Sequence, residues 1–154
     1  MRYAAQTGVP VDRSKSEIER LLARYGASRF AHGWDRDKAV VIFHAHERTI
    51  RFTLPLPDRK EFSKTTTGRE RRNPQATEHA WEQACRQRWR ALALVIKAKL
   101  EAVESQIAEF ETEFLAYVVL PNGTTVGEWV GPQIGEAYAK GRLPKMLPGL
   151  GETS

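Results

Sequence analysis

Hydrophobic positions near the start of the chain recur at the spacing of a helix. Ser14–Glu17 has the sequence of a capping box, in which the serine and glutamate side chains bond free backbone amides of the first turn. The apolar residues that follow keep steps of three and four: Ile18, Leu21, Leu22 and Tyr25. This pattern predicts an amphipathic helix over 15–25 that stops at Gly26, preceded by a flexible arm over 1–13.

After this helix the period shortens to that of strands. Segments 29–34, 38–45 and 49–54 are short, rich in β-branched and aromatic residues, and separated by polar turns. The third segment alternates apolar and polar residues, whereas the second is apolar on both faces, so the second should be central. Pro55 and Pro57 should end the ladder, since proline has no backbone N–H. We therefore expect a three-stranded antiparallel meander.

A polar stretch over 58–73 has no sustained apolar period, and we expect it to be a mobile basic loop. Asn73–Pro74 closes it and is typical of a helix start. Asparagine is a good N-cap, and proline at the first helical position gives up an amide that has no intrahelical partner.

The longest apolar stripe follows Pro74. Neither proline nor glycine interrupts 75–120, and a continuous helix of about 40 residues would reach about 60 Å, more than a small domain spans. Either part of the stripe contacts another chain, forming a homo-oligomer through the long helix, or the helix breaks near Glu111 and 114–120 form a strand. The stripe comprises Trp81, Cys85, Trp89, Leu92, Ile96, Leu100, Val103, Ile107, Phe110, Phe114 and Tyr117.

The last third is rich in turns. Thr125–Glu128 is a second capping box, and we expect Pro132 to divide the following region into two short helices. Segment 143–150 is apolar but broken by proline, and should form an extended strap before a tail over 151–154. The predicted class is α+β: an N-terminal helix, a three-stranded antiparallel β-meander, one long amphipathic helix and a short C-terminal helical region, in a single domain over 14–150.

Composition adds the broad class. Of 154 residues, 41% are hydrophobic and 28% are charged, which is typical of globular proteins. The single cysteine, Cys85, lies on the apolar stripe, and we interpret it as a small core residue. No segment approaches the roughly 18 apolar residues of a membrane span, and the first residues lack the apolar run of a signal peptide, so we expect a cytoplasmic protein.

Charge is unevenly distributed. Segment 58–99 contains eleven Lys or Arg and five Asp or Glu, whereas 100–139 contains seven Glu and no Lys or Arg. A positive surface suits phosphates, and an acidic surface suits a basic protein. We predict a nucleic-acid interface with Trp81 and Trp89 interleaved as stacking platforms, although core packing explains these tryptophans better and a solvated face explains the arginines equally well. The predicted phosphate-binding residues are Arg69, Arg71, Arg72, Arg86, Arg88 and Arg90.

Signatures of catalysis are weak. His44 and His46 lie two apart on a predicted strand and could bind zinc, but a fourth ligand is absent and ordinary packing is the better interpretation. Asp35 and Asp37 are explained by a turn. The sequence has no phosphate-binding glycine loop, nucleophile elbow or Cys-x-x-Cys pair. We therefore expect no enzyme, no catalytic residues, no cofactor and no bound metal.

Five stretches carry a resemblance: 17–27, 54–57, 86–92, 97–102 and 119–129. Together they look like small proteins of unassigned function carried by bacteriophages and prophages. The resemblance implies a phage setting in the cytoplasm of a bacterial host, and it implies no mechanism.

Three functional hypotheses follow. The first is a non-enzymatic protein that associates with nucleic acid through its basic surface. The second is an inhibitor or adaptor that binds a host or phage protein through the acidic end of the long helix and an exposed apolar stripe. The third and weakest is a metal-dependent enzyme at His44 and His46.

Overall fold

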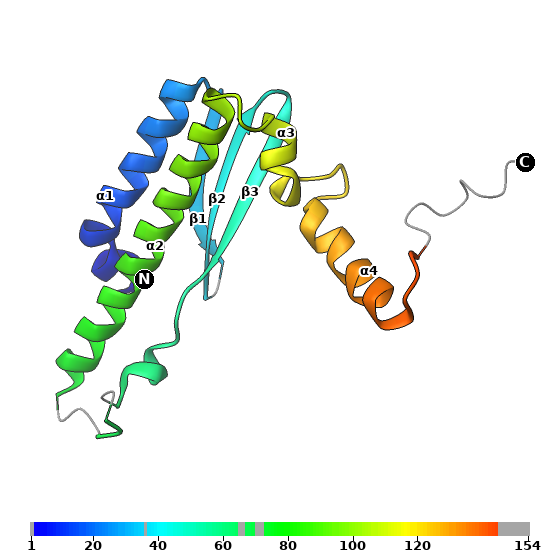
Figure 1. The fold of residues 1–154 in the computed structure, drawn as a ribbon. Coiled ribbons are helices and arrows are strands. Elements are labelled where there is room, and N and C mark those ends of the chain that lie inside the picture. Colours follow the sequence, from blue (N-terminus) through cyan, green and yellow to red (C-terminus); the bar gives the residue numbers. More distant parts are fainter. Residues whose placement is uncertain (1, 36, 65–66, 70–72, 145–154) are drawn as a thin grey trace, which may run out of the picture.

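The computed structural model describes residues 2–35, 37–64, 67–69 and 73–144, with backbone alone for 2–10. It confirms the α+β class (Figure 1). The elements in chain order are α1 (Arg2–Tyr25), β1 (Arg29–Asp35), β2 (Lys38–Ala45), β3 (Arg48–Pro55), the 3₁₀ turn η1 (Arg59–Phe62), α2 (Pro74–Glu104), α3 (Phe110–Glu113), the 3₁₀ turn η2 (Leu115–Tyr117) and α4 (Val126–Lys140).

Helix α1 begins at Arg2, so the prediction of a flexible arm over 1–13 is wrong for the described part of that segment. Val11 shows why the helix extends past the capping box. It is fully buried and lies seven residues before Ile18, so it continues the apolar stripe by two turns. The predicted stop is confirmed: Gly26 has a φ of 101°, and the amide of Ala27 bonds the carbonyl of Leu22 at 3.0 Å.

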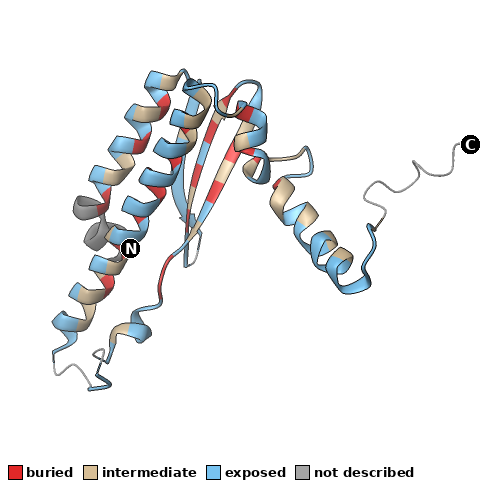
Figure 2. Cartoon of the chain, in the orientation of Figure 1, coloured by how far each residue is buried: buried red, intermediate tan, exposed pale blue. Residues whose placement is uncertain are grey.

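The three strands form the predicted antiparallel meander, in the order β1-β2-β3. On β2, alternate residues from Ala39 to Ala45 are buried, and Ile50 and Phe52 of β3 are buried beside them. Helices α1 and α2 cover this face side by side, running in the same direction, and no described helix covers the opposite face of β1 and β2 (Figures 1 and 2). The central strand is therefore apolar on both faces but buried on only one.

The start of α2 matches its sequence signal. The side chain of Asn73 accepts a hydrogen bond from the amide of Gln75 at 2.9 Å, and Pro74 opens the first turn. The preceding segment was predicted to be mobile throughout, but residues 59–62 form η1, which packs against α2. The indole N–H of Trp81 bonds the carbonyl of Pro57 at 2.7 Å and connects this part of the segment to the core.

Helix α2 ends at Glu104, seven residues before the predicted break. Gln106 takes a φ of 64°, a left-handed turn without glycine, and Ile107 is 82% exposed although it belongs to the predicted stripe. From Trp81 to Leu100 the stripe is buried against the sheet and α1 of the same chain. No second chain is needed to cover it.

Segment 110–120 is neither a continuation of the helix nor a full strand. Phe114 is fully buried against β2 and β3, and single bridges join Ile50 to Val118 and Val119 to Thr125. Lys99 of α2 donates to the carbonyl of Glu113 at 3.1 Å. These contacts fold the segment back over the edge of β3.

Helix α4 projects from the rest of the molecule (Figure 1). Its capping box at Thr125 and Glu128 is confirmed, but Pro132 does not divide it. The proline removes one intrahelical hydrogen bond, and caps at both ends hold the helix: the capping box at its start and Gly141, with a φ of 68°, at its end. The predicted strap begins with exposed Leu143, and residues 145–154 lie outside the described part.

Thr125→Ala should destabilise α4 locally. The threonine hydroxyl accepts from the amide of Glu128 at 3.2 Å, and loss of such a cap costs about 1 kcal/mol. Since no described side chain of α4 is buried, tertiary packing will not compensate. Amide hydrogen exchange should therefore accelerate across the first turns of α4. Thr112→Ala, at an exposed position of α3, is the control, and equal exchange in both variants would contradict the expectation.

Candidate nucleic-acid interface

The structure separates the arginines that the sequence grouped together. Arg86 and Arg90 are one turn apart on the flank of α2 that faces α1. Arg88 lies on the other flank and donates to the carbonyl of Pro55 at 3.1 Å. Arg69 is exposed in the segment before α2, and Arg71 and Arg72 lie outside the described residues. The predicted six therefore do not form a single described surface.

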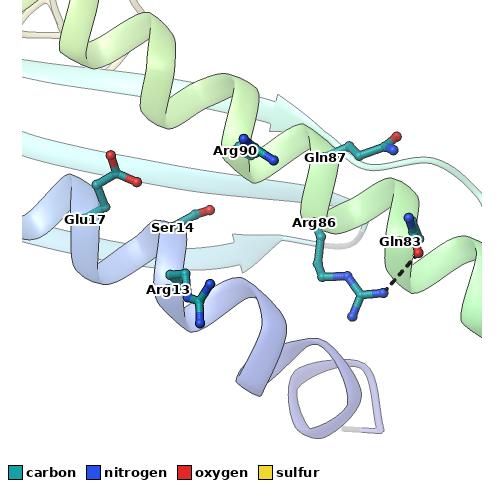
Figure 3. Close-up of a pocket in the computed structure, with 7 residues that line it drawn as sticks. All are labelled: Arg13, Ser14, Glu17, Gln83, Arg86, Gln87 and Arg90. Carbon is teal, nitrogen blue, oxygen red and sulfur yellow. Dashed lines mark hydrogen bonds between the residues drawn. The ribbon is translucent and has the colours of Figure 1, made fainter.

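A hollow of about 590 Å³ lies between α1 and α2. Arg13 reaches into it from α1, and Arg86 and Arg90 reach into it from α2 (Figure 3). Glu17 is the one acidic residue in its lining. The remaining lining residues are polar and uncharged: Ser14, Gln83 and Gln87.

A second hollow of about 370 Å³ continues the first along the same pair of helices. Its cations are Arg20 and Arg24 from α1 and Lys97 from α2. Because the helices run in parallel, residues near 13 lie beside residues near 86, and residues near 24 lie beside Lys97. We call the six cations along this groove the basic seam: Arg13, Arg20, Arg24, Arg86, Arg90 and Lys97.

The basic seam carries charge that the fold does not neutralise. The ion pairs of the described chain use other cations, namely Arg48, Arg51, Arg59, Lys99 and Lys140. Within the seam, Arg20 donates to the carbonyl of Ser16 at 3.3 Å and Arg86 to the amide oxygen of Gln83 at 3.4 Å, both neutral acceptors. All six cations are exposed except Arg86, which is half-buried. They are free to pair with an external anion.

The basic seam ends at an acidic boundary. Where α1 finishes, Glu101 and Glu104 of α2 border the same groove as Arg24 and Lys97. This boundary is where the charge of the sequence changes from basic to acidic near residue 100. An anionic ligand is therefore attracted to the groove from Arg13 and Arg86 to Arg24 and Lys97, and repelled from the last turn of α2, which carries Glu101 and Glu104.

The tryptophans of α2 are core residues and not stacking platforms. Trp81 and Trp89 are each 3% exposed, which confirms the core interpretation. Cations cover their remaining surface: the Arg59 guanidinium lies 4.1 Å from the ring centre of Trp81, and the Lys15 ammonium lies 5.0 Å from that of Trp89. Their rings cannot reach a base.

Cys85 is also confirmed as a core residue. It is fully buried, and this burial raises the pKa of its thiol to about 11, although the nearby cations Arg59 and Arg88 oppose the rise. At neutral pH the group is an uncharged thiol, which is a poor nucleophile.

The two histidines considered as zinc ligands have different surroundings. His44 Nδ1 lies 3.3 Å from the hydroxyl of Thr49, whereas His46 is in the turn after β2 with a φ of 51° and stacks on Phe110 at 4.5 Å. Among the described residues, no three His, Cys, Asp or Glu side chains come close enough to hold a metal ion.

Comparisons with known proteins give no relative: no protein-family model, curated protein or solved structure matches this chain. None of the described helices has the length and apolar character that a bilayer crossing requires.

Sequence reasoning missed half of the basic seam. Arg13 was assigned to a flexible arm, and Arg20 and Arg24 were given no role, because only tertiary packing brings α1 beside α2. One signal was available. Positions 13, 20 and 24 repeat at steps of seven and four, which places three arginines on one face of a helix opposite its apolar stripe.

Proposed function

We propose that this protein binds nucleic acid through the basic seam, as a binding protein without catalytic chemistry. The observation that carries the proposal is that six cations from two helices line two adjoining hollows, with Glu17 the one acidic residue in both linings, and that none of the six forms an ion pair among the described residues. A row of this kind is costly to leave unpaired unless it meets an anion, because like charges repel along the groove.

The dimensions of the basic seam suit a sugar-phosphate backbone. From Arg13 to Arg24 the helix rises about 16 Å at 1.5 Å per residue, and the row from Arg86 to Lys97 has the same length. A duplex carries one phosphate charge per roughly 1.7 Å of axis when both strands are counted, so about ten phosphates lie within this length, on all sides of the duplex. Those on the side that faces the seam can pair with its cations.

The ligand that fits best is a duplex. Proteins that bind single strands combine cations with exposed aromatic rings on which bases stack. The described residues lining the two hollows of the seam include no aromatic side chain, and both tryptophans of α2 are buried. Contacts are then made to the backbone, so the protein should bind duplexes of different sequence with similar affinity.

Binding to a fluorescent duplex at two salt concentrations tests the proposal. If six phosphates are contacted, affinity should fall about a thousandfold between about 50 mM and about 200 mM salt, because each contact releases condensed counterions. A single strand of equal length should bind more weakly at both concentrations. Absence of binding to the duplex near 50 mM salt would remove the proposal.

A second candidate function is binding to a protein through α4. This helix has no buried described residue, and it exposes Ile134 and Tyr138, which lie one turn apart on the same side; the side chain of Tyr138 is 87% exposed. Such a surface favours the inhibitor or adaptor hypothesis. A complex that survives nuclease treatment and is lost when Tyr138 and Ile134 are changed to Ser would support it.

The phage setting remains a prediction. Because it implies a bacterial host, a bacterial lysate is the appropriate source of partners for this experiment.

A further inference from the structure

Strand β1 is an open edge of the sheet. It pairs with β2 on one side, and the described chain provides no strand on its other side. Six of its seven residues are exposed and Phe30 is half-buried. The opposite edge of the sheet is partly covered, because Val119 donates from its backbone to the carbonyl of Thr49 on β3 at 2.8 Å.

The edge also lacks the usual protection against pairing. Exposed edge strands are commonly blocked by proline, by lysine near the middle of the strand or by a bulge. β1 has none of these: its charged residues, Arg29 and Asp35, stand at its two ends, and it pairs with β2 without interruption from Arg29 to Asp35. On the side away from β2, the outward N–H and C=O groups of alternate β1 residues meet no other described strand.

We infer that β1 is a dimerisation edge, which pairs antiparallel with β1 of a second copy about a two-fold axis at His32. The strand is complementary to itself in this register, with opposite charges at both ends and aromatic residues next to them. The resulting partners are Arg29 with Asp35, Phe30 with Trp34, Ala31 with Gly33, and His32 with His32 of the second copy.

The faces of the sheet agree with this register. Phe30 and Trp34 pair with Phe43 and Ala39 of β2, both buried, so they lie on the face that the helices cover. Arg29 and Asp35 lie on the open face. Residues opposite each other in an antiparallel pair share a face, so aromatic residues meet aromatic residues and charges meet charges. Sliding the register by one residue would place the two helix layers on opposite faces of the joint sheet.

At the centre of the proposed interface, His32 of one copy lies opposite His32 of the other. The groups that face His32 are Lys15, Glu19 and Asp12 from α1, and its neighbour across the ladder is Val41. Burial and the nearby Lys15 ammonium lower the pKa of His32, outweighing the two carboxylates. At neutral pH both imidazoles are mostly uncharged, so they meet without repulsion.

Sedimentation of the full chain, without nucleic acid, across a series of protein concentrations tests the dimer. Arg29→Glu and Asp35→Arg should each weaken it by about tenfold, because each creates two like-charged contacts across the axis. An equimolar mixture of the two variants should recover the affinity of the original protein, since in the mixed dimer both end contacts join opposite charges. The swap R29E/D35R within one chain should recover it as well.

Asp35 pairs with Lys38 at the end of the hairpin, so a substitution there also affects folding of the hairpin. A second variant, at Gly33, tests the dimer without changing this pair. Nothing lies within 4 Å of a Cβ built on Gly33, so Gly33→Lys fits the monomer and places lysine on the edge near the axis. It should weaken the dimer, because the two lysines stand diagonally across the axis on the same face. Thr53→Lys adds the same charge to the open face on β3 and should leave the dimer intact. A monomer at every concentration, a dimer that resists Gly33→Lys, or a mixture that does not recover would each overturn the inference.

Discussion

Changing Arg13, Arg86 and Arg90 together to Gln should weaken duplex binding about a hundredfold at low salt, since each substitution removes a charge-assisted hydrogen bond to a phosphate. These three arginines line the larger hollow of the basic seam, and none forms an ion pair in the described chain. The dependence of binding on salt should also flatten, by about one unit of logarithmic slope for each phosphate that the variant no longer neutralises. A salt titration of fluorescence anisotropy measures both effects.

A matched variant separates the basic seam from overall charge. Lys38, Lys140 and Arg142 are exposed and lie away from the α1–α2 groove, and changing all three to Gln lowers net charge by the same amount. This control should bind with nearly the original affinity and slope. Equal losses in the two triple variants would show that binding follows net charge and would refute the seam as the site.

Phe114→Ala should destabilise the protein by about 3–5 kcal/mol, the usual cost of deleting a buried aromatic ring. Phe114 is fully buried, and its ring centre lies 4.8 Å from that of Phe110, 5.8 Å from that of Phe43 and 6.3 Å from that of Phe52. It holds segment 110–120 against the sheet. Chemical denaturation should therefore show a much lower midpoint, in a protein whose total stability is of the order of 5–15 kcal/mol.

The adjacent Leu115 supplies the control for this experiment. Its side chain is 47% exposed, so Leu115→Ala should cost less than about 1 kcal/mol. A similar small loss for Phe114→Ala would mean that segment 110–120 is not part of the cooperative core.

The elements that the sequence predicted well are those with strong local signals. Ile50, Phe52 and Leu54 alternate with polar residues, and the register of β3 places them on the helix-covered face. Asn73–Pro74 and Thr125–Glu128 mark helix starts through hydrogen bonds within a few residues of each other. These features depend on interactions between residues that are close together in the chain, so they can be predicted from the sequence alone.

The failures have non-local causes. Gly8 and Pro10 disfavour helix, yet α1 passes through both, and buried Val11 shows that packing outweighs propensity there. The end of α2 carries no proline or glycine, and the chain turns at Gln106 because Phe110 and Phe114 are buried against the sheet face. Contacts between distant segments decide both cases.

The candidate site could be only half predicted. The charge count identified a basic region correctly, but consecutive arginines of a helix point in different directions, so Arg88 faces away from Arg86 and Arg90. The α1 arginines became part of the same surface only through the packing of two helices far apart in sequence. The net charge of a segment indicates which class of ligand it can bind, and the tertiary structure determines which residues contact that ligand.

Both helices lie on one face of the sheet (Figure 1), so an assembly that extends the sheet edge to edge keeps every helix pair on a single side. Because each seam runs along its helices, the two seams would lie side by side on that surface, and each could hold its own duplex. A dimer of this kind would bring two separate segments of nucleic acid together, whereas the monomer would coat a single one.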